Sequence, residues 1–150
     1  MKKSISLLLV FLVLLGCSTA PTAFVDAESL ENPGGWVTDQ QAMDVLGSPY
    51  LLAHGAGVPV EDASGTVTLP ETGRWHVWVR TYNWTSPWSE KEGPGAFCVT
   101  IGGESLGKTC GTTGKGWEWQ YAGSFRASGK EISLGLHDLT GFDGRCDAVA

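Results

Sequence analysis

Basic residues and cysteines are both scarce in this sequence, and each shortage excludes a class of function. Lysine and arginine number 10 against 16 aspartates and glutamates, which gives a formal net charge of −6 and a pI near 4.9. Nucleic-acid phosphates select basic surfaces, so we expect no nucleic-acid partner. The four cysteines form no C-x-x-C pair and the three histidines are scattered, so the spacing of a zinc site is missing.

Motifs for nucleotide binding and hydrolysis are also missing. The sequence contains no P-loop and no G-x-S-x-G. Three acidic residues, Asp138, Asp143 and Asp147, do crowd one segment near the C-terminus. Short acidic residues between glycines are typical of turns and cation sites. We therefore favour a turn or cation site here over a pair of catalytic carboxylates. We therefore expect no catalytic residue in this chain.

The only long apolar run, Ser4 to Leu15, follows the basic start Met1-Lys2-Lys3. The run is too short for a transmembrane helix, which needs about 20 apolar residues, and it has the form of a secretory signal peptide. Leu14-Leu15-Gly16-Cys17 resembles the lipobox of bacterial lipoproteins, in which the cysteine thiol is acylated. We expect residues 1–16 to be removed, Cys17 to be lipidated, and the protein to be anchored in the bacterial cell envelope. The alternative is an ordinary signal peptide that is cut near Ala20 or Ala23.

The mature sequence predicts an all-β domain. It is rich in glycine and tryptophan, with 21 and seven residues, and its short alternating segments are separated by turn signals. After a linker over residues 17–23, we expect a two-sheet jelly-roll sandwich over 24–150 with one short helix. The helix is predicted at 39–46 and ends at Gly47. The predicted strands are Phe24–Leu30, Thr66–Pro70, Arg74–Thr81, Ala96–Ile101, Glu104–Leu106, Trp117–Tyr121, Gly123–Ala127 and Glu131–His137.

The C-terminal segment predicts a sheet edge whose last strand is incomplete. The pattern predicts the end of one strand, then a polar, glycine-rich loop, and then a new strand that opens at Asp147–Ala150. Unfinished edge strands invite aggregation. We therefore expect a partly unpaired edge strand here, in a domain truncated at its C-terminus.

The cysteines after Cys17 are odd in number. Cys98 and Cys110 flank the predicted hairpin at Gly102-Gly103 and are candidates for a disulfide, but buried reduced thiols are an equal alternative. Cys146 has no obvious partner.

Aromatic residues in polar surroundings point to a binding surface. Tyr82, Trp84 and Trp88 lie in a Ser/Pro/Asn-rich segment that is typical of a loop, and Trp117 and Trp119 share one face of a predicted strand. Aromatic planes stack on the C–H face of a sugar while polar side chains bind its hydroxyls. The candidate ligand-binding residues are Tyr82, Trp84, Trp88, Trp117, Trp119, Asp138, Asp143 and Arg145. The alternative role for such rings is core packing, which we favour for Trp75 and Trp78.

Several stretches resemble known families. Ala27-Glu28-Ser29, the Leu-Pro-Glu-Thr-Gly turn and Arg145-Cys146-Asp147-Ala148 resemble carbohydrate-binding jelly-roll modules. A longer set of stretches is similar to the N-terminal module of bacterial FAD-dependent oxidoreductases. These stretches are Phe24–Ser29, Gly35–Gln41, Gly47–Gly55, Trp78–Thr81, Trp117–Trp119 and His137–Ala148.

The resemblance implies a non-catalytic module that binds a polysaccharide or docks onto a downstream flavoprotein domain. It implies FAD in the parent protein and no cofactor in this chain, except for a structural calcium whose matching ligands are Glu28 and Asp147. The alternative function is that of the parent enzyme, a flavin-dependent oxidoreductase that acts on a sugar or a related substrate.

Overall fold

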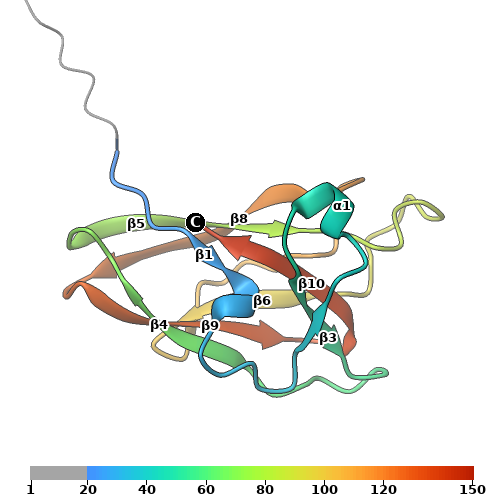
Figure 1. Cartoon of the computed structure of the whole chain (residues 1–150), viewed down its shortest axis with the longest axis horizontal. Helices are drawn as coiled ribbons and strands as arrows, with labels where there is room; N and C mark the ends of the chain where they lie inside the picture. The colour runs from blue at the N-terminus through green and yellow to red at the C-terminus, as the bar shows by residue number, and fades with distance from the viewer. Residues whose placement is uncertain (1–19) are drawn as a thin grey trace, which may run out of the picture.

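The computed structural model describes residues 20–150 and shows a sandwich of two antiparallel sheets (Figure 1). This confirms the all-β fold that the sequence predicts. The first sheet has the order β2-β3-β10-β5-β8, with β1 paired to β10. Its strands are β1 (Val25–Asp26), β2 (Val37–Asp39), β3 (Tyr50–His54), β5 (Gly73–Thr81), β8 (Glu118–Ala127) and β10 (Phe142–Val149). The second sheet has the order β4-β9-β6-β7, with β4 (Ala63–Thr68), β6 (Phe97–Ile101), β7 (Glu104–Ser105) and β9 (Glu131–Asp138).

Alternating side chains of both sheets fill the space between them. Along β5, Val77 and Val79 are buried while His76 and Trp78 face solvent, as the period-two pattern requires. Val79 meets buried side chains of the opposite sheet such as Phe97 and Leu136 in one continuous core. Each fully buried aliphatic or aromatic side chain contributes roughly 1.5–3 kcal/mol by leaving water.

The predicted hairpin is confirmed. β6 and β7 pair as Thr100 with Ser105 and Ile101 with Glu104, so Gly102 and Gly103 form the two-residue turn between them. Both glycines have positive φ, 61° and 85°. Two-residue hairpin turns of this type require positive φ at both positions, which favours glycine.

The predicted unpaired edge at Asp147–Ala150 is wrong. β10 begins at Phe142 and lies in the interior of its sheet, paired with β5 on one side and with β3 and β1 on the other. Even Ala150 exchanges two backbone hydrogen bonds with Trp78, at 2.8 and 2.9 Å. Aspartate and glycine are weak strand formers, so the start of this strand has the composition of a loop. Pairing on both sides overrides that local preference.

Three smaller predictions are corrected. Only Val25–Asp26 of the predicted first strand is extended, and Ala27–Ser29 forms the 3-10 turn η1. Helix α1 spans Met43–Leu46 rather than starting at residue 39, because Asp39 pairs with Tyr50 at the end of β2. It ends at Gly47, as predicted. The two strands predicted on either side of Ala122 are one strand, β8, with an irregularity in its pairing to β5 at that point.

Cys98, Cys110 and Cys146 are buried, unbridged thiols in this structure. Burial, together with the nearby Cys98, raises the pKa of Cys110 to about 12. Burial also raises the pKa of Cys146 well above its ordinary value. Because the thiolate is the reactive form, both thiols are held unreactive in the folded state.

The predicted signal peptide and Cys17 lie outside the described residues. Within residues 20–150, no helix has the length and apolar character needed to cross a membrane.

The interior position of β10 leads to a stability prediction. Val149 is 5% exposed and belongs to the core, so Val149→Asp buries an unpaired charge. We expect the free energy of unfolding in urea to fall by about 3 kcal/mol or more. Val58 is exposed, so Val58→Asp is the matched control and should unfold like the wild type. Equal stability of the two variants would show that the C-terminal strand lies at an exposed edge.

Candidate functional site

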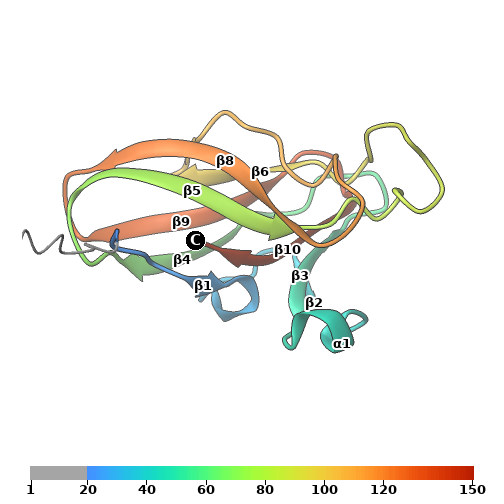
Figure 2. The same cartoon turned by 90° about the horizontal axis from the view of Figure 1, so that it is seen from above.

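Five of the predicted ligand-binding residues lie around one cleft, at the end of the sandwich where the loops after β5 and before β8 meet. They are Tyr82, Trp84, Trp88, Trp117 and Arg145. Gln41, Ala42 and Tyr50 complete the lining, and the cleft has a volume of about 240 Å³. In Figure 2 the yellow-green loop after β5 projects from one end of the sandwich, and the blue start of the described chain lies at the other end.

The loop that carries Trp84 and Trp88 is held by a buried asparagine. The side-chain oxygen of Asn83 accepts hydrogen bonds from the backbone N–H of Thr85, at 3.2 Å, and from its hydroxyl, at 2.9 Å. The backbone N–H groups of Trp88 and Ser89 both donate to the carbonyl of Thr85 at 3.0 Å. Gly93 packs so closely on the Asn83 side chain that a Cβ atom there would collide with it. These contacts give the loop a defined conformation.

Arg145 and Trp84 form one side of the cleft. The guanidinium of Arg145 lies 5.6 Å from the centre of the Trp84 ring, a cation–π distance. It also donates to the backbone carbonyl of Asp143 at 2.8 Å. The indole N–H of Trp84 donates to the carbonyl of Phe142 at 3.0 Å. Trp84 is therefore fixed in place, whereas Trp88 is 78% exposed and leaves its ring free for a ligand.

Three further aromatic rings line the cleft as a continuous group. Trp117 contacts Tyr50 edge-on, with 4.9 Å between ring centres, and Tyr82 with 5.7 Å between ring centres. Tyr50 is 2% exposed and anchors the group to β3. Rings that pack on one another in this way present a rigid surface, which keeps the entropic cost of binding low.

A hydrogen bond between neighbouring strands fixes Tyr50. Its hydroxyl donates to the Asp39 carboxylate at 2.8 Å. Burial and this hydrogen bond raise the pKa of Tyr50. Burial opposes ionisation of Asp39 as well, but the hydrogen bonds from the Gln41 backbone and from Tyr50 outweigh it and lower the pKa of that carboxyl. Tyr50, Gln41 and Ala42 were not predicted as site residues, because only the pairing of Asp39 with Tyr50 brings them to the cleft.

The lining of the cleft is aromatic, with few polar groups. Within residues 20–150 the cleft is lined by aromatic rings, one amide and one guanidinium, and no carboxylate lines it. Glycoside hydrolysis commonly needs two carboxyl groups at a fixed separation. The rings and the hydrogen-bond donors of Gln41 and Arg145 are the groups that recognise a sugar face and its hydroxyls.

The other three predicted ligand-binding residues lie outside the cleft. Trp119 packs against Phe24 at 6.3 Å between ring centres. Asp138 is buried, and its carboxylate accepts hydrogen bonds from the backbone N–H groups of Val60, Thr140 and Gly141. Asp143 has positive φ, and its carboxylate lies 2.6 Å from a ring nitrogen of His54. Asp138 and Asp143 therefore shape the turns beside the cleft.

The two predicted calcium ligands lie in one acidic region beside β1. Asp147 is 3% exposed and contacts the Ser48 hydroxyl at 3.3 Å and the Arg80 guanidinium at 3.4 Å. One carboxylate oxygen of Glu28 is buried and has no hydrogen-bond partner. An unpaired buried carboxylate oxygen is what a hard cation such as calcium would satisfy. The described residues contain no group of three or more His, Cys, Asp or Glu side chains placed to hold a metal, so side chains alone do not complete a ligand set.

Burial shifts the protonation of both carboxyl groups. It raises the pKa of Glu28 above 4.5, against a backbone hydrogen bond that lowers it, and the charges of Asp26 and Asp147 raise it further. Burial also raises the pKa of Asp147, and the nearby Arg80 only partly offsets this effect. Both groups are therefore destabilising when they are charged and uncompensated.

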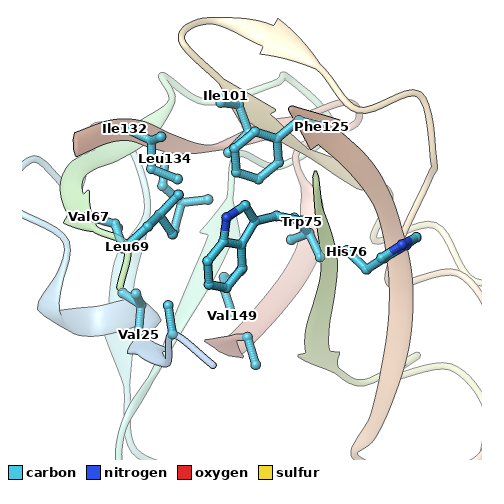
Figure 3. Close-up of a pocket in the computed structure, with 13 residues that line it drawn as sticks. Val25, Val67, Leu69, Trp75, His76, Ile101, Phe125, Ile132, Leu134 and Val149 are labelled. Atoms are coloured by element: carbon cyan, nitrogen blue, oxygen red, sulfur yellow. The ribbon is translucent and has the colours of Figure 1, made fainter. Parts of the chain in front are cut away.

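A second hollow lies between the two sheets and is apolar. Figure 3 shows Trp75 and Phe125 projecting into it from β5 and β8, with Ile101 and Leu134 on the opposite sheet. Its volume is only about 40 Å³, too small for a sugar ring. Trp75 thus packs between the sheets, whereas Trp78 is 44% exposed. Core packing, which the sequence favoured for both, is therefore correct for Trp75 and wrong for Trp78, because the two residues have opposite parity on β5 and face opposite sides of the sheet.

Comparison with known proteins finds the fold rather than a close relative. No family model and no curated protein match the sequence. A family 35 carbohydrate-binding module from Clostridium thermocellum superposes with a TM-score of 0.64 at 14% identity, covering 87% of this chain and 96% of the module. A family 36 module in complex with calcium and xylotriose superposes with a TM-score of 0.58 at 18% identity, covering 86% of this chain and 98% of that one. Carbohydrate-binding modules share this fold.

Larger enzymes contain the same fold as one part. A xanthan lyase from Paenibacillus superposes with a TM-score of 0.62 at 15% identity over 88% of this chain. This chain spans 13% of the length of that lyase.

The raised pKa of Glu28 predicts a pH-dependent effect of substitution. A carboxyl whose folded-state pKa is raised favours the fold below its ordinary pKa of 4.5, and that advantage is lost as the pH rises through the folded-state pKa. In metal-free buffer, Glu28→Gln should therefore unfold at higher urea concentration than the wild type at neutral pH, and at nearly the same concentration in acid. Glu104→Gln, at an exposed position, should show no such difference. A Glu28→Gln variant that is less stable at neutral pH would contradict this account.

Proposed function

We propose that this protein is a non-catalytic carbohydrate-binding module and that its ligand lies in the cleft of Tyr82, Trp84, Trp88, Trp117 and Arg145. The observation that carries the proposal is the convergence of these residues, drawn from three separate segments, around one cleft with a free indole at its rim. The fold shared with carbohydrate-binding modules supports it.

The arrangement assigns different tasks to the residues. Trp88 offers an exposed ring for stacking on a pyranose, while Tyr82 and Trp117 form a fixed aromatic wall. Arg145 and Gln41 supply donors for ring hydroxyls. Because the rings are held by packing and by the Asn83 hydrogen bonds, little order needs to be created when the sugar binds.

We also propose that a calcium ion stabilises the region of Glu28 and Asp147. Bound calcium would neutralise these carboxylates, whose pKa values are raised chiefly by burial. The unpaired oxygen of Glu28 supports the proposal. Since calcium takes six to eight oxygen ligands, backbone carbonyls or waters would have to contribute the remainder.

The wider setting rests on the sequence alone. We propose that the module is exported, is anchored through Cys17, and works beside a downstream flavoprotein domain, as its resemblance to bacterial FAD-dependent oxidoreductases implies. In that setting the module would hold the parent enzyme near a glycan. A role in docking onto the flavoprotein domain is the second candidate. The exposed aromatic face of β5 and β8 favours a docking role of some kind, because large exposed aromatic surfaces mark interaction sites.

Removal of the Trp88 ring should abolish sugar binding without unfolding the protein. We expect Trp88→Ala to lose roughly 1.5–3 kcal/mol of binding free energy, about what burial of a large apolar side chain provides. Retardation in native gels that contain soluble xylan, mannan or xanthan measures this loss. The melting temperature should hardly change, because Trp88 is exposed. Trp84→Ala should weaken binding too, but at some cost in stability, because the Trp84 ring contacts Arg145 and Phe142.

Trp119→Ala is the control for this experiment. Trp119 is an exposed indole, 43% accessible, that lies outside the cleft. Its removal should leave retardation intact. If Trp119→Ala abolishes retardation and Trp88→Ala does not, the sugar site is on the sheet face and our assignment of the cleft is wrong.

Calcium should raise the melting temperature of the wild type relative to buffer with a chelator. The Glu28→Gln variant should lose most of this increase, because its side chain no longer provides a charged ligand. Magnesium should have a smaller effect, since it demands a tighter octahedral shell. An equal increase in both proteins would place the ion elsewhere, and no increase in the wild type would refute the calcium proposal.

A further inference from the structure

The outer face of β5 and β8 combines aromatic and basic side chains. The outward-facing residues are cross-strand partners, so they share one surface. Arg74 pairs with Arg126, His76 with Ser124, Trp78 with Tyr121, and Arg80 with Trp119. We call the set Arg74, His76, Trp78, Trp119, Tyr121 and Arg126 the basic-aromatic face.

The charges of this face are not balanced within the protein. Arg80 contacts Asp147, but among residues 20–150 neither Arg74 nor Arg126 forms an ion pair. Like charges that lie directly opposite each other on a sheet are destabilising. Arg74 and Arg126 are exposed, adjacent and without an ion pair, although the whole protein carries a net charge of −6. They therefore form a local positive patch that can attract an anionic surface.

The aromatic rings beside the arginines are exposed. Trp78 and Trp119 retain 44% and 43% of their surface, and Tyr121 is also exposed. Trp78 packs on Tyr121 with 5.1 Å between ring centres. Tryptophan and tyrosine are the residues enriched at the interface between membrane and water, where an amphipathic ring sits at headgroup level.

The start of the described chain lies against this face. Ala20–Ala23 line a hollow together with Arg74, His76 and Trp78, and one acidic residue, Glu71, also lines it. Cys17, the predicted lipidated residue, is three residues before Ala20. Three residues span at most about 10 Å, so acyl chains on Cys17 would enter the membrane close to Arg74 and Trp78. The cleft lies at the opposite end of the sandwich from Ala20, beside the loop after β5 that projects there in Figure 2.

We propose that the basic-aromatic face contacts the surface of the membrane that holds the lipid anchor. Arg74 and Arg126 would meet phospholipid phosphates, and Trp78, Tyr121 and Trp119 would lie at the headgroup boundary. The proposal depends on acylation of Cys17 and is independent of the sugar cleft. It predicts a fixed orientation in which the outer face of β5 and β8 lies on the membrane and the cleft, at the end of the sandwich, opens to the side.

The proximity of the anchor favours a membrane over an acidic polysaccharide as the anion. A polysaccharide would need no tether, and nothing would place it at this end of the molecule. An acylated Cys17 brings lipid headgroups to this face at high effective concentration, so that even weak contacts would be populated.

Tryptophan quenching in vesicles tests the orientation. The acylated full chain is reconstituted in vesicles of phosphatidylglycerol and phosphatidylcholine whose acyl chains carry bromine, a short-range quencher. We expect Trp78→Phe to remove roughly half of the lipid-dependent quenching, because Trp78 and Trp119 are the two indoles on the face. Trp88→Phe is the matched control and should leave it unchanged. Combined Arg74→Gln and Arg126→Gln substitution should reduce quenching, and added salt should do the same to the wild type.

Three results would overturn the proposal. Loss of quenching in Trp88→Phe but not in Trp78→Phe would show that the cleft end faces the membrane. Mass spectrometry that finds no acyl group on the mature N-terminus would remove the anchor. Retardation of the wild type in an alginate gel, lost in the double arginine variant while vesicle quenching is unchanged, would assign the face to an acidic polysaccharide. Retardation by neutral xylan or mannan in the same variants reports on the cleft separately.

Discussion

The structure depends most on the pairing of β10 in the interior of the larger sheet. This strand bonds to β5 along one side and to β3 and β1 along the other, so it joins the two ends of the chain. Its side chains contribute to three different regions of the molecule. Cys146 and Val149 enter the core, Arg145 reaches the cleft, and Asp147 meets the acidic region beside Glu28. A shift of this strand by one residue would move every one of these groups to the wrong face.

The proposed sugar site combines loop residues with residues of a rigid sheet. Tyr50 belongs to β3 and Arg145 to β10, so the floor of the cleft moves only with the sheet. Trp84, Trp88 and Trp117 lie on connecting segments, where sequence can change at little cost to the core. Such a division lets one fold carry different specificities, because the loops choose the ligand while the strands keep the rings in position.

The sequence predicted the sandwich and much of the cleft for identifiable reasons. Alternation along β5 and the Gly102-Gly103 turn are local signals, and they appear in the structure as expected. The loop composition around Tyr82, Trp84 and Trp88 indicated partly exposed rings; Trp88 is exposed, whereas Tyr82 and Trp84 are half-buried. Local signals did not reveal that β10 is interior, because its glycine and two aspartates are typical of a loop and only tertiary pairing makes it a strand. They also did not reveal Tyr50, whose position depends on the register of β2 and β3.

The three buried thiols make the chain vulnerable to oxidation before it has folded. In an oxidising medium an unfolded chain would expose all three, and a disulfide between any two of them would leave the third free to cross-link to another molecule. Once the sheets close, the same thiols are out of reach of oxidants, and their raised pKa values keep the Cys110 and Cys146 sulfur atoms protonated. Folding and oxidation are therefore in competition, and the long-range pairing of β10, which a chain forms slowly, sets how long the vulnerable interval lasts.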